Sequence, residues 1–313
     1  MCADVRRTSR VRSGVRKPGL PVVPLQRLAR EVRRSADDFR KRVRRCRHEL
    51  DVRSVHHLRI QARRLVVWCE LLAALGAGNH AVEARRRVKR LLRSLGRLRD
   101  LHVQRDLLEG APKRLVKPAR FLRRRLKREE SRRMQRVKDR CRRQHPGRIS
   151  DLLDSVFQAG RFSRDVSPEV LSQGIIDWIA SLQAEAGKRL RGARATMPAS
   201  VHRFRIAVKR LRYGLEAAVE LMPKLKSGAA DPLRDLQVEL GKIQDAEVCR
   251  LRVEGLSVGS KSGVPRLEGL HTWLMRTRDE HVHHLLSRRT ELLAALTVCG
   301  ISAALRNSTD SKR

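Results

Sequence analysis

Aromatic residues are scarce in this 313-residue chain: Phe, Trp and Tyr make up 3% of it, and Tyr213 is the only tyrosine. Proteins that bind single-stranded nucleic acid usually stack the bases on exposed aromatic rings. This chain has few rings from which to build such platforms. Binding of nucleic acid through its phosphate backbone alone needs no rings, and the composition leaves that alternative open.

Cysteines are few and dispersed, and no two of them form a C-x-x-C pair. The six are Cys2, Cys46, Cys69, Cys141, Cys249 and Cys299. Several occupy apolar helical positions, so we expect buried free thiols in a reducing cytoplasm. No apolar run approaches the roughly 18 residues of a membrane span, and the basic N-terminus lacks the apolar stretch and cleavage site of a secretory signal. We therefore expect a cytoplasmic protein without a membrane span.

Motifs of catalysis and of metal binding are also missing. The sequence contains no G-x-x-x-x-G-K-[ST] phosphate loop and no Ser/His/Asp or Cys/His constellation. The only histidine cluster is His281, His283 and His284; His281 and His284 share a helix face, but no third ligand is near in sequence, so we expect a solvated or packing role. We expect no enzyme activity, no cofactor and no metal, with a metal-dependent phosphatase as the hypothesis that phosphate release would revive.

Negative charge is in short supply relative to positive charge. Lys and Arg number 72 against 33 Asp and Glu, a net charge of +39, and 58 of the 72 cations are Arg. An Arg-rich genome could explain the ratio of Arg to Lys but not the net surplus. A surplus of this size predicts a polyanionic partner: nucleic acid, polyphosphate or an anionic membrane surface.

One stretch, 201–216 (VHRFRIAVKRLRYGLE), concentrates this charge on one face of a predicted helix. At about 100° per residue its cations form one stripe, and its apolar residues form an adjacent stripe that can pack against other helices. The cationic stripe contains His202, Arg205, Lys209 and Arg212. Because like charges on one face repel, a bound polyanion is the natural counterweight.

The same pattern occurs 146 residues earlier, in 55–70 (VHHLRIQARRLVVWCE), with Arg63 in the place of Lys209. The identical pairs are Val55/Val201, His56/His202, Arg59/Arg205, Ile60/Ile206, Arg64/Arg210, Leu65/Leu211 and Glu70/Glu216. A second block, L-G-[RK]-x-x-D, recurs at an offset of 145, in 95–100 and 240–245. Two ordered blocks at nearly one offset predict an internal duplication, with a period too long for a small-repeat solenoid.

The hydrophobic periodicity predicts an all-α fold, with no β-alternating segment of useful length. Helices are expected at about 25–50, 54–75, 80–109 and 116–144, and again from 168, over 201–222, over 229–254 and over 266–304. Short connections imply two antiparallel, up-and-down four-helix bundles. The predicted organisation is a disordered basic tail (1–24), a first repeat (25–145), a linker (146–167) in which 149–158 could form a short helix, a second repeat (168–304) and a polar tail (305–313).

The motif V-H-x-[LF]-R-I-x-x-[RK]-R-L in each half, R-Y-x-L-E at 212–216 and the paired L-G-[RK]-x-x-D blocks resemble the CHAD family, the conserved histidine α-helical domain. The resemblance covers about residues 25–304. It implies two four-helix bundles related by a pseudo-twofold axis, with a basic groove or pore between them. It also implies non-catalytic binding of inorganic polyphosphate, often at polyphosphate granules. The anion-contacting residues that it implies are His56, Arg59, Arg63, Arg64, His202, Arg205, Lys209, Arg210 and Arg212.

Two further expectations concern the acidic and glycine residues of the blocks. One carboxylate per repeat, Asp100 and Asp245, would make a poor Mg²⁺ site amid so many cations, so we expect these aspartates, like Glu70 and Glu216, to pair with arginines of the motif helices. Gly96 and Gly241 are expected to permit close helix approach. The alternative function is a protein that binds or compacts DNA or RNA through its backbone, with the Arg-rich segment 116–144 and the N-terminal tail as its main contacts.

Overall fold

The computed structural model describes residues 22–158, 162, 166–222, 230–258 and 267–298, and every regular element in these ranges is helical. The first half contains α1 (Leu25–His48), α2 (Val52–Ala74), α3 (Gly78–Glu109), a 3₁₀ turn (Lys113–Leu115), α4 (Val116–Arg143) and α5 (Pro146–Gln158). The second half contains α6 (Pro168–Arg191), α7 (Pro198–Leu221), α8 (Asp231–Val258), α9 (Glu268–Ser287) and α10 (Arg289–Val298). The all-α prediction is confirmed.

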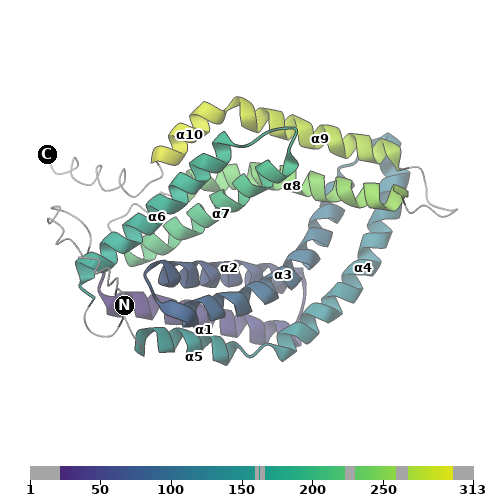
Figure 1. The fold of residues 1–313 in the computed structure, drawn as a ribbon. Helices are drawn as coiled ribbons and strands as arrows, with labels where there is room; N and C mark the ends of the chain where they lie inside the picture. The colour runs from purple at the N-terminus through teal and green to yellow at the C-terminus, as the bar shows by residue number, and fades with distance from the viewer. Residues whose placement is uncertain (1–21, 159–161, 163–165, 223–229, 259–266, 299–313) are drawn as a thin grey trace, which may run out of the picture.

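The helices form two bodies, one from α1–α5 and the other from α6–α10 (Figure 1). They meet where α2 packs against α7 and where α3 packs against α8, which are the helices that contain the repeated sequence blocks. The long helices α3 and α4 leave the first body and run to the end of the second body where α8 and α9 lie (Figure 1). The duplication itself stays a prediction from the sequence.

The helix ends follow the local chemistry of the chain. Asp51 caps α2 by accepting a hydrogen bond from the Ser54 backbone, and the Ser54 hydroxyl accepts one from the Asp51 backbone. This reciprocal pair satisfies two donors that the first turn of a helix leaves free. After α2 the chain turns at Gly76, which has φ of +88°, a conformation that glycine adopts without steric cost. Ser167 caps α6 and Pro168 is its first residue, as predicted.

Two predicted boundaries need correction. The segment predicted as a linker contains α5, which is longer than the short helix considered there and buries Ile149, Leu153 and Val156 against α1 and α3. The last predicted helix is two helices, because the chain breaks at Arg288 between α9 and α10. The predicted tails lie outside the described residues, apart from 22–24.

Most apolar side chains form one core that runs through both bodies. A second, smaller core lies at the far end of α3 and α4, where Leu101 and Leu122 of the first half pack with Cys249, Val253 and Leu270 of the second. We call this second cluster the junction core. It belongs to neither half alone.

The described cysteines are buried and unpaired, as predicted: Cys46, Cys69, Cys141 and Cys249. Cys2 and Cys299 lie outside the described residues. None of the described helices has the length and apolar character that crossing a membrane requires.

Candidate anion-binding site

The packing of α2 against α7 brings four of the predicted site residues into one electrostatic environment. Arg59 and Arg63 come from α2, and Arg205 and Lys209 come from α7. The charge of Arg63 lowers the pKa of both Arg205 and Lys209, and the charge of Arg205 lowers the pKa of Arg59. We call these four residues the central cluster. Each side chain is partly buried.

Crowding of like charges in a partly buried place disfavours the charged forms. Burial lowers the pKa of the Lys209 ammonium to about 6, and Arg63, Arg205 and Arg59 lower it in the same direction. Burial, followed by the charge of Arg63, lowers the pKa of Arg59 to about 10. The pKa of Arg205 is lowered chiefly by burial as well. These cations therefore repel one another, and a bound anion would relieve that repulsion.

The side chain of Arg59 reaches across to α3, the helix that contains the L-G-[RK]-x-x-D block. Its Nη1 donates hydrogen bonds to the backbone oxygens of Leu95 (3.0 Å) and Gly96 (3.2 Å). A Cβ atom at Gly96 would lie 3.9 Å from this same nitrogen, an ordinary contact, and a Cβ atom at Gly241 would meet nothing within 4 Å. The expectation that these glycines permit close helix approach is therefore wrong. They leave open space beside the motif helices.

Asp100 and Asp245 lie near the central cluster but do not pair with it. In the described ranges neither carboxylate has a cation within 4.0 Å, so the predicted ion pairs with motif arginines are wrong for these two residues. The cations act on Asp245 only through their charge: Arg205 and Lys209 act to lower its pKa. Burial has the larger effect and raises the pKa of Asp245. Within the described ranges, no carboxylate therefore neutralises the cations of the cluster at ion-pair distance.

The two glutamates of the motif helices do pair with motif arginines, as expected. Glu70 is buried and accepts from Arg210 Nε of α7 at 3.1 Å and from Lys89 Nζ at 2.9 Å. Glu216 accepts from Arg212 Nη1 at 2.6 Å. Arg210 and Arg212, which the resemblance implied as anion ligands, are therefore already paired with carboxylates. Arg210 ties α7 to α2, and Arg212 is held along its own helix.

Arg212 makes a further contact, and Arg64 is one more implied ligand outside the central cluster. Arg212 also lies over the ring of Tyr213, 4.3 Å from its centroid, a stacked arrangement that favours a guanidinium. Arg64, the counterpart of Arg210, is exposed and acts to lower the pKa of Glu220, which burial raises. The structure thus separates the central cluster from a peripheral group, Arg64, Arg210 and Arg212, that faces carboxylates.

The two motif histidines are exposed at the start of the cationic stripes. Burial of its ring and then the charge of Arg99 lower the pKa of His56, and Arg59 acts in the same direction. We expect a nearby phosphate array to favour the protonated ring, whereas the neighbouring cations of the protein alone have the opposite effect. His202 shares a hydrogen bond through Nδ1 with Gln244 of α8.

Arg99 is a site residue that the sequence did not single out. It lies on α3 directly before Asp100, and its charge influences His56, Arg59 and Asp245. Its counterpart in the second block is Gln244, which is uncharged. The position inside a repeated block was a usable signal, but the charge of Arg99 is not kept at Gln244, unlike that of the pair Arg63 and Lys209.

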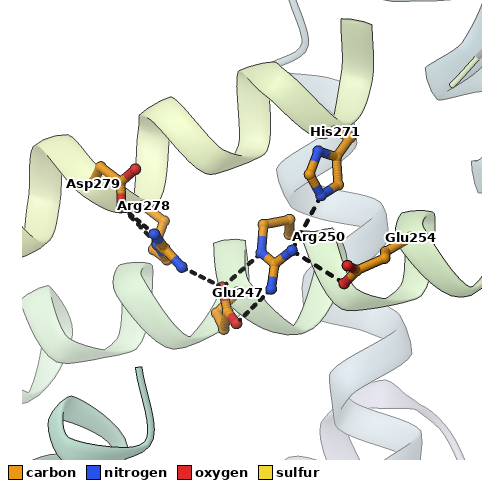
Figure 2. A network of polar contacts seen from close by, with 6 residues as sticks. All are labelled: Glu247, Arg250, Glu254, His271, Arg278 and Asp279. Carbon is orange, nitrogen blue, oxygen red and sulfur yellow. Dashed lines mark hydrogen bonds and ion pairs between the residues drawn. The ribbon is translucent and has the colours of Figure 1, made fainter. Parts of the chain in front are cut away.

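A second polar cluster lies beside the site, between α8 and α9 (Figure 2). Glu247 accepts two bonds from Arg250, at 3.0 Å each, and one from Arg278 Nη1 of α9 at 3.1 Å. Arg250 also contacts Glu254 and the ring of His271 (Figure 2). Hydrogen bonding to Glu247 raises the pKa of Arg250. Because its cations are matched by carboxylates, this network fastens two helices and presents little free charge.

The predicted histidine cluster contains one ordered contact: His284 Nδ1 lies 2.7 Å from Glu239 Oε1 of α8. In the ranges that the structure describes, no three His, Cys, Asp or Glu side chains come together closely enough to hold a metal ion.

Comparison with known proteins identifies the family. The model of the CHAD domain matches residues 32–254, well over half of the chain. The fold is similar to the crystal structure of the CHAD domain from the plant Ricinus communis, with a TM-score of 0.62, 18% sequence identity, and coverage of 94% of this chain and 96% of that one. It is also similar to PptA from Streptomyces chartreusis, with a TM-score of 0.59, 15% identity, and coverage of 90% and 99%. No curated protein sequence matches the chain. The chain belongs to the CHAD family.

Proposed function

We propose that this protein binds inorganic polyphosphate, without catalysis, through the central cluster of Arg59, Arg63, Arg205 and Lys209. One observation carries the proposal. Four partly buried cations converge from two helices, and in the described part of the chain none of them has an ion-pair partner. Such an arrangement costs free energy when empty, and a chain of phosphates supplies the missing counter-charge.

The chemistry of the cluster suits phosphate oxygens. Guanidinium groups offer a planar fork of donors that matches two oxygens at once, and an ammonium group acts as a point charge. Polyphosphate carries about one charge per phosphate and no bases, so its affinity comes from counterion release and charge-assisted hydrogen bonds, as for nucleic-acid backbones. Cations on two facing helices can contact both sides of one extended chain.

The absence of catalysis is part of the proposal. The carboxylates nearest the cluster are Asp100 and Asp245, and burial raises the pKa of Asp245, which weakens it as a ligand for a hard cation. The peripheral carboxylates Glu70 and Glu216 are engaged with arginines and lysines. Release of phosphate from polyphosphate or nucleoside triphosphates with Mg²⁺ or Mn²⁺ would contradict this part and support a phosphatase.

The test of binding compares two double variants on the same helices. Arg63→Gln/Arg205→Gln removes two charges from the central cluster. Arg53→Gln/Arg203→Gln removes two exposed charges from the same helices, Arg53 at the start of α2 and Arg203 two residues before Arg205 on α7. Binding of labelled long-chain polyphosphate is measured at near-physiological salt against excess duplex DNA and RNA. We expect the central variant to lose at least tenfold in affinity, and the control variant to lose little. Equal losses would mean a generic polyanion binder.

For localisation we propose the cytoplasm, at polyphosphate granules, because a binding module without catalysis acts where its polymer accumulates. A fluorescent fusion should form foci that coincide with a polyphosphate stain. The Arg63→Gln/Arg205→Gln variant should stay diffuse at equal expression. Foci that persist in this variant would contradict the proposal.

A further inference from the structure

A cation-lined pocket lies between α3 and α4, which pack against each other (Figure 1). Its volume is about 280 Å³, and the buried side chain of Val137 forms part of its wall. Five arginines line it, Arg97 from α3 and Arg133, Arg136, Arg140 and Arg143 from α4. We call it the α3–α4 pocket. The central cluster uses none of these residues.

The pocket and the central cluster lie on different sides of α3. Arg97 lines the pocket, whereas Arg99 influences the pKa of His56 and of Arg59. Two residues that are two positions apart in an α-helix differ by about 200° around its axis. Arg97 and Arg99 therefore project to nearly opposite sides of α3, and the pocket is a separate site.

The four arginines that α4 contributes form a one-sided stripe. They lie at positions i, i+3, i+7 and i+10, which is also the spacing of the cationic stripe on α7. At about 100° per residue, these positions span about 80° of the circumference of the helix and about 15 Å of its length. Arg97 of α3 lies across the pocket from this stripe. The pocket therefore collects guanidinium groups from two helices.

Carboxylates match little of this positive charge. Arg133 pairs with Glu129 on its own helix at 2.6 Å. The acidic residue that lines the pocket is Asp139, whose Oδ1 lies 3.9 Å from Nη1 of Arg142, a residue that does not line the pocket. Within the described ranges, the other four guanidinium groups make no ion pair and no side-chain hydrogen bond: Arg97, Arg136, Arg140 and Arg143.

The fold does not require this accumulation of charge. In the predicted duplication α9 corresponds to α4, yet α9 contains two Lys and Arg against three Asp and Glu, whereas α4 contains 14 against three. Like charges three and four residues apart weaken a helix. A bound anion would offset this repulsion, so an anionic ligand is the partner that the pocket favours.

The size and the lining of the pocket select a small phosphate compound. Its volume of about 280 Å³ lies just below the roughly 300–1,000 Å³ of pockets that enclose drug-sized ligands. Guanidinium forks match pairs of phosphate oxygens, and a phosphate chain carries about one charge per phosphate, so three or four phosphates would match the unpaired arginines. Among the described residues no aromatic side chain lines the pocket, so nothing there stacks on the base of a nucleotide.

We propose that the α3–α4 pocket binds a compact group of three or four phosphates that carries no base, separately from the central cluster. The same chemistry occurs in a free oligophosphate, such as inorganic tripolyphosphate, and at the end of a long polyphosphate chain. The inference does not depend on what the central cluster binds.

The experiment measures binding of inorganic tripolyphosphate to the full chain by calorimetry at near-physiological salt. All proteins contain Arg63→Gln/Arg205→Gln, so that the central cluster contributes little to the binding. The pocket variant is Arg97→Gln/Arg140→Gln, which removes one guanidinium group from each of the two helices that form the pocket.

The matched control is Arg86→Gln/Arg124→Gln, which removes one exposed arginine from each of the same two helices outside the pocket. We expect the pocket variant to lose about tenfold or more in affinity, because two charge-assisted contacts are removed, and the control to lose little. ATP should bind no more tightly than tripolyphosphate, because its base finds no partner. Circular dichroism verifies that the helix content of the variants is equal.

Equal losses in the pocket and control variants would overturn the proposal, because binding would then follow total charge. Unchanged binding in the pocket variant would overturn it as well. Citrate that binds as tightly as tripolyphosphate would show a general anion site and contradict the selection of phosphate.

Long-chain polyphosphate, added at the same concentration of chains, distinguishes the two sources of the ligand. If it displaces tripolyphosphate from the pocket, the ligand is the end of a chain; if tripolyphosphate stays bound, the ligand is a free oligophosphate. A failure of the proposal for the central cluster would leave these results unchanged, because the background already lacks Arg63 and Arg205.

Discussion

Arg210 Nε lies 3.1 Å from Glu70 Oε2, across the packing of α7 on α2 and between residues 140 positions apart in the chain. Glu70 is buried and also contacts Lys89 and Arg85 of α3. One carboxylate thus connects three helices of two halves. Three cations around it leave no local excess of negative charge, so removing the carboxylate leaves repulsion behind.

Glu70→Gln should therefore destabilise the protein by about 1–3 kcal/mol, less than the 3–5 kcal/mol of a fully buried pair, because the three cations are partly exposed. Urea unfolding followed by circular dichroism measures the loss. The matched control is Glu49→Gln, which removes an exposed pair with Arg45 and should cost no more than about 0.5 kcal/mol. Similar losses in the two variants would show that Glu70 does not fasten the halves together.

The open space beside Gly241 leads to a second prediction, about the stability of a glycine-to-alanine variant. Because an added Cβ meets nothing there, Gly241→Ala should raise the free energy of unfolding by about 0.5–1 kcal/mol, the usual gain from glycine to alanine inside a helix. Gly214→Ala on α7 should do the reverse, by about 1–3 kcal/mol, because its Cβ would lie 2.8 Å from Leu182 Cδ1. Thermal and urea unfolding of the pair test this opposition, and a stable Gly214→Ala variant would contradict it.

Lys209 predicts a dependence of stability on pH. Its pKa of about 6 in the folded chain lies below the ordinary value of 10.5, so between these values the unfolded chain binds a proton that the folded chain does not. The free energy of unfolding should therefore rise with pH between these values and decrease as the pH falls toward 6, where both states bind the proton. Compared with Lys209→Met, the wild type should gain about 1.4 kcal/mol more per pH unit between pH 7 and 9. Equal slopes would mean that Lys209 stays charged in the folded protein without added anion.

Anion binding should reverse this shift. If polyphosphate binds at the central cluster as proposed, it should restore the charged form of Lys209, and binding at pH 8 should take up protons from the buffer. Calorimetry in two buffers of different ionisation enthalpy measures this uptake. Lys209→Arg, which is charged throughout, should bind with smaller uptake, and His56→Gln distinguishes any contribution of the neighbouring ring. Equal uptake in the wild type and Lys209→Arg would contradict the assignment.

The buried cysteines should be inert in the folded protein. Burial raises the pKa of Cys69, Cys141 and Cys249 to about 12, and only the thiolate is an effective nucleophile. In a Cys2→Ser/Cys299→Ser background, iodoacetamide at pH 8 should modify none of the remaining cysteines until urea is added. Rapid modification of any of these three without denaturant would contradict their placement in the core.

The sequence predicted the helices well because apolar periodicity agrees with strong start and stop signals at most ends, as at the stop at Gly76 and the start at Ser167–Pro168. It predicted no break at Arg288, where neither glycine nor proline marks the end of α9. It placed the cations of the central cluster on two motif helices, but the predicted partners of Asp100 and Asp245 were wrong. The distance from each aspartate to the motif arginines depends on how α3 and α8 pack against α2 and α7. The spacing of residues within one helix carries no information about that packing.

The division of the motif cations into a central cluster and a peripheral group could not be predicted from the sequence either. Arg63 and Arg64 are neighbours in one motif, and only the position of α7 decides that the first joins the cluster while the second faces Glu220. Which side of α4 is covered is a property of the assembled helices.

The junction core has a consequence for how the chain folds. Because Leu101 and Leu122 are covered by Cys249, Val253 and Leu270, neither half contains all the side chains that complete its own interior. The halves should therefore unfold in one cooperative transition, with coincident curves from probes placed in each. A gene cut between α5 and α6 would yield two fragments that each expose this cluster and recover native structure only when mixed.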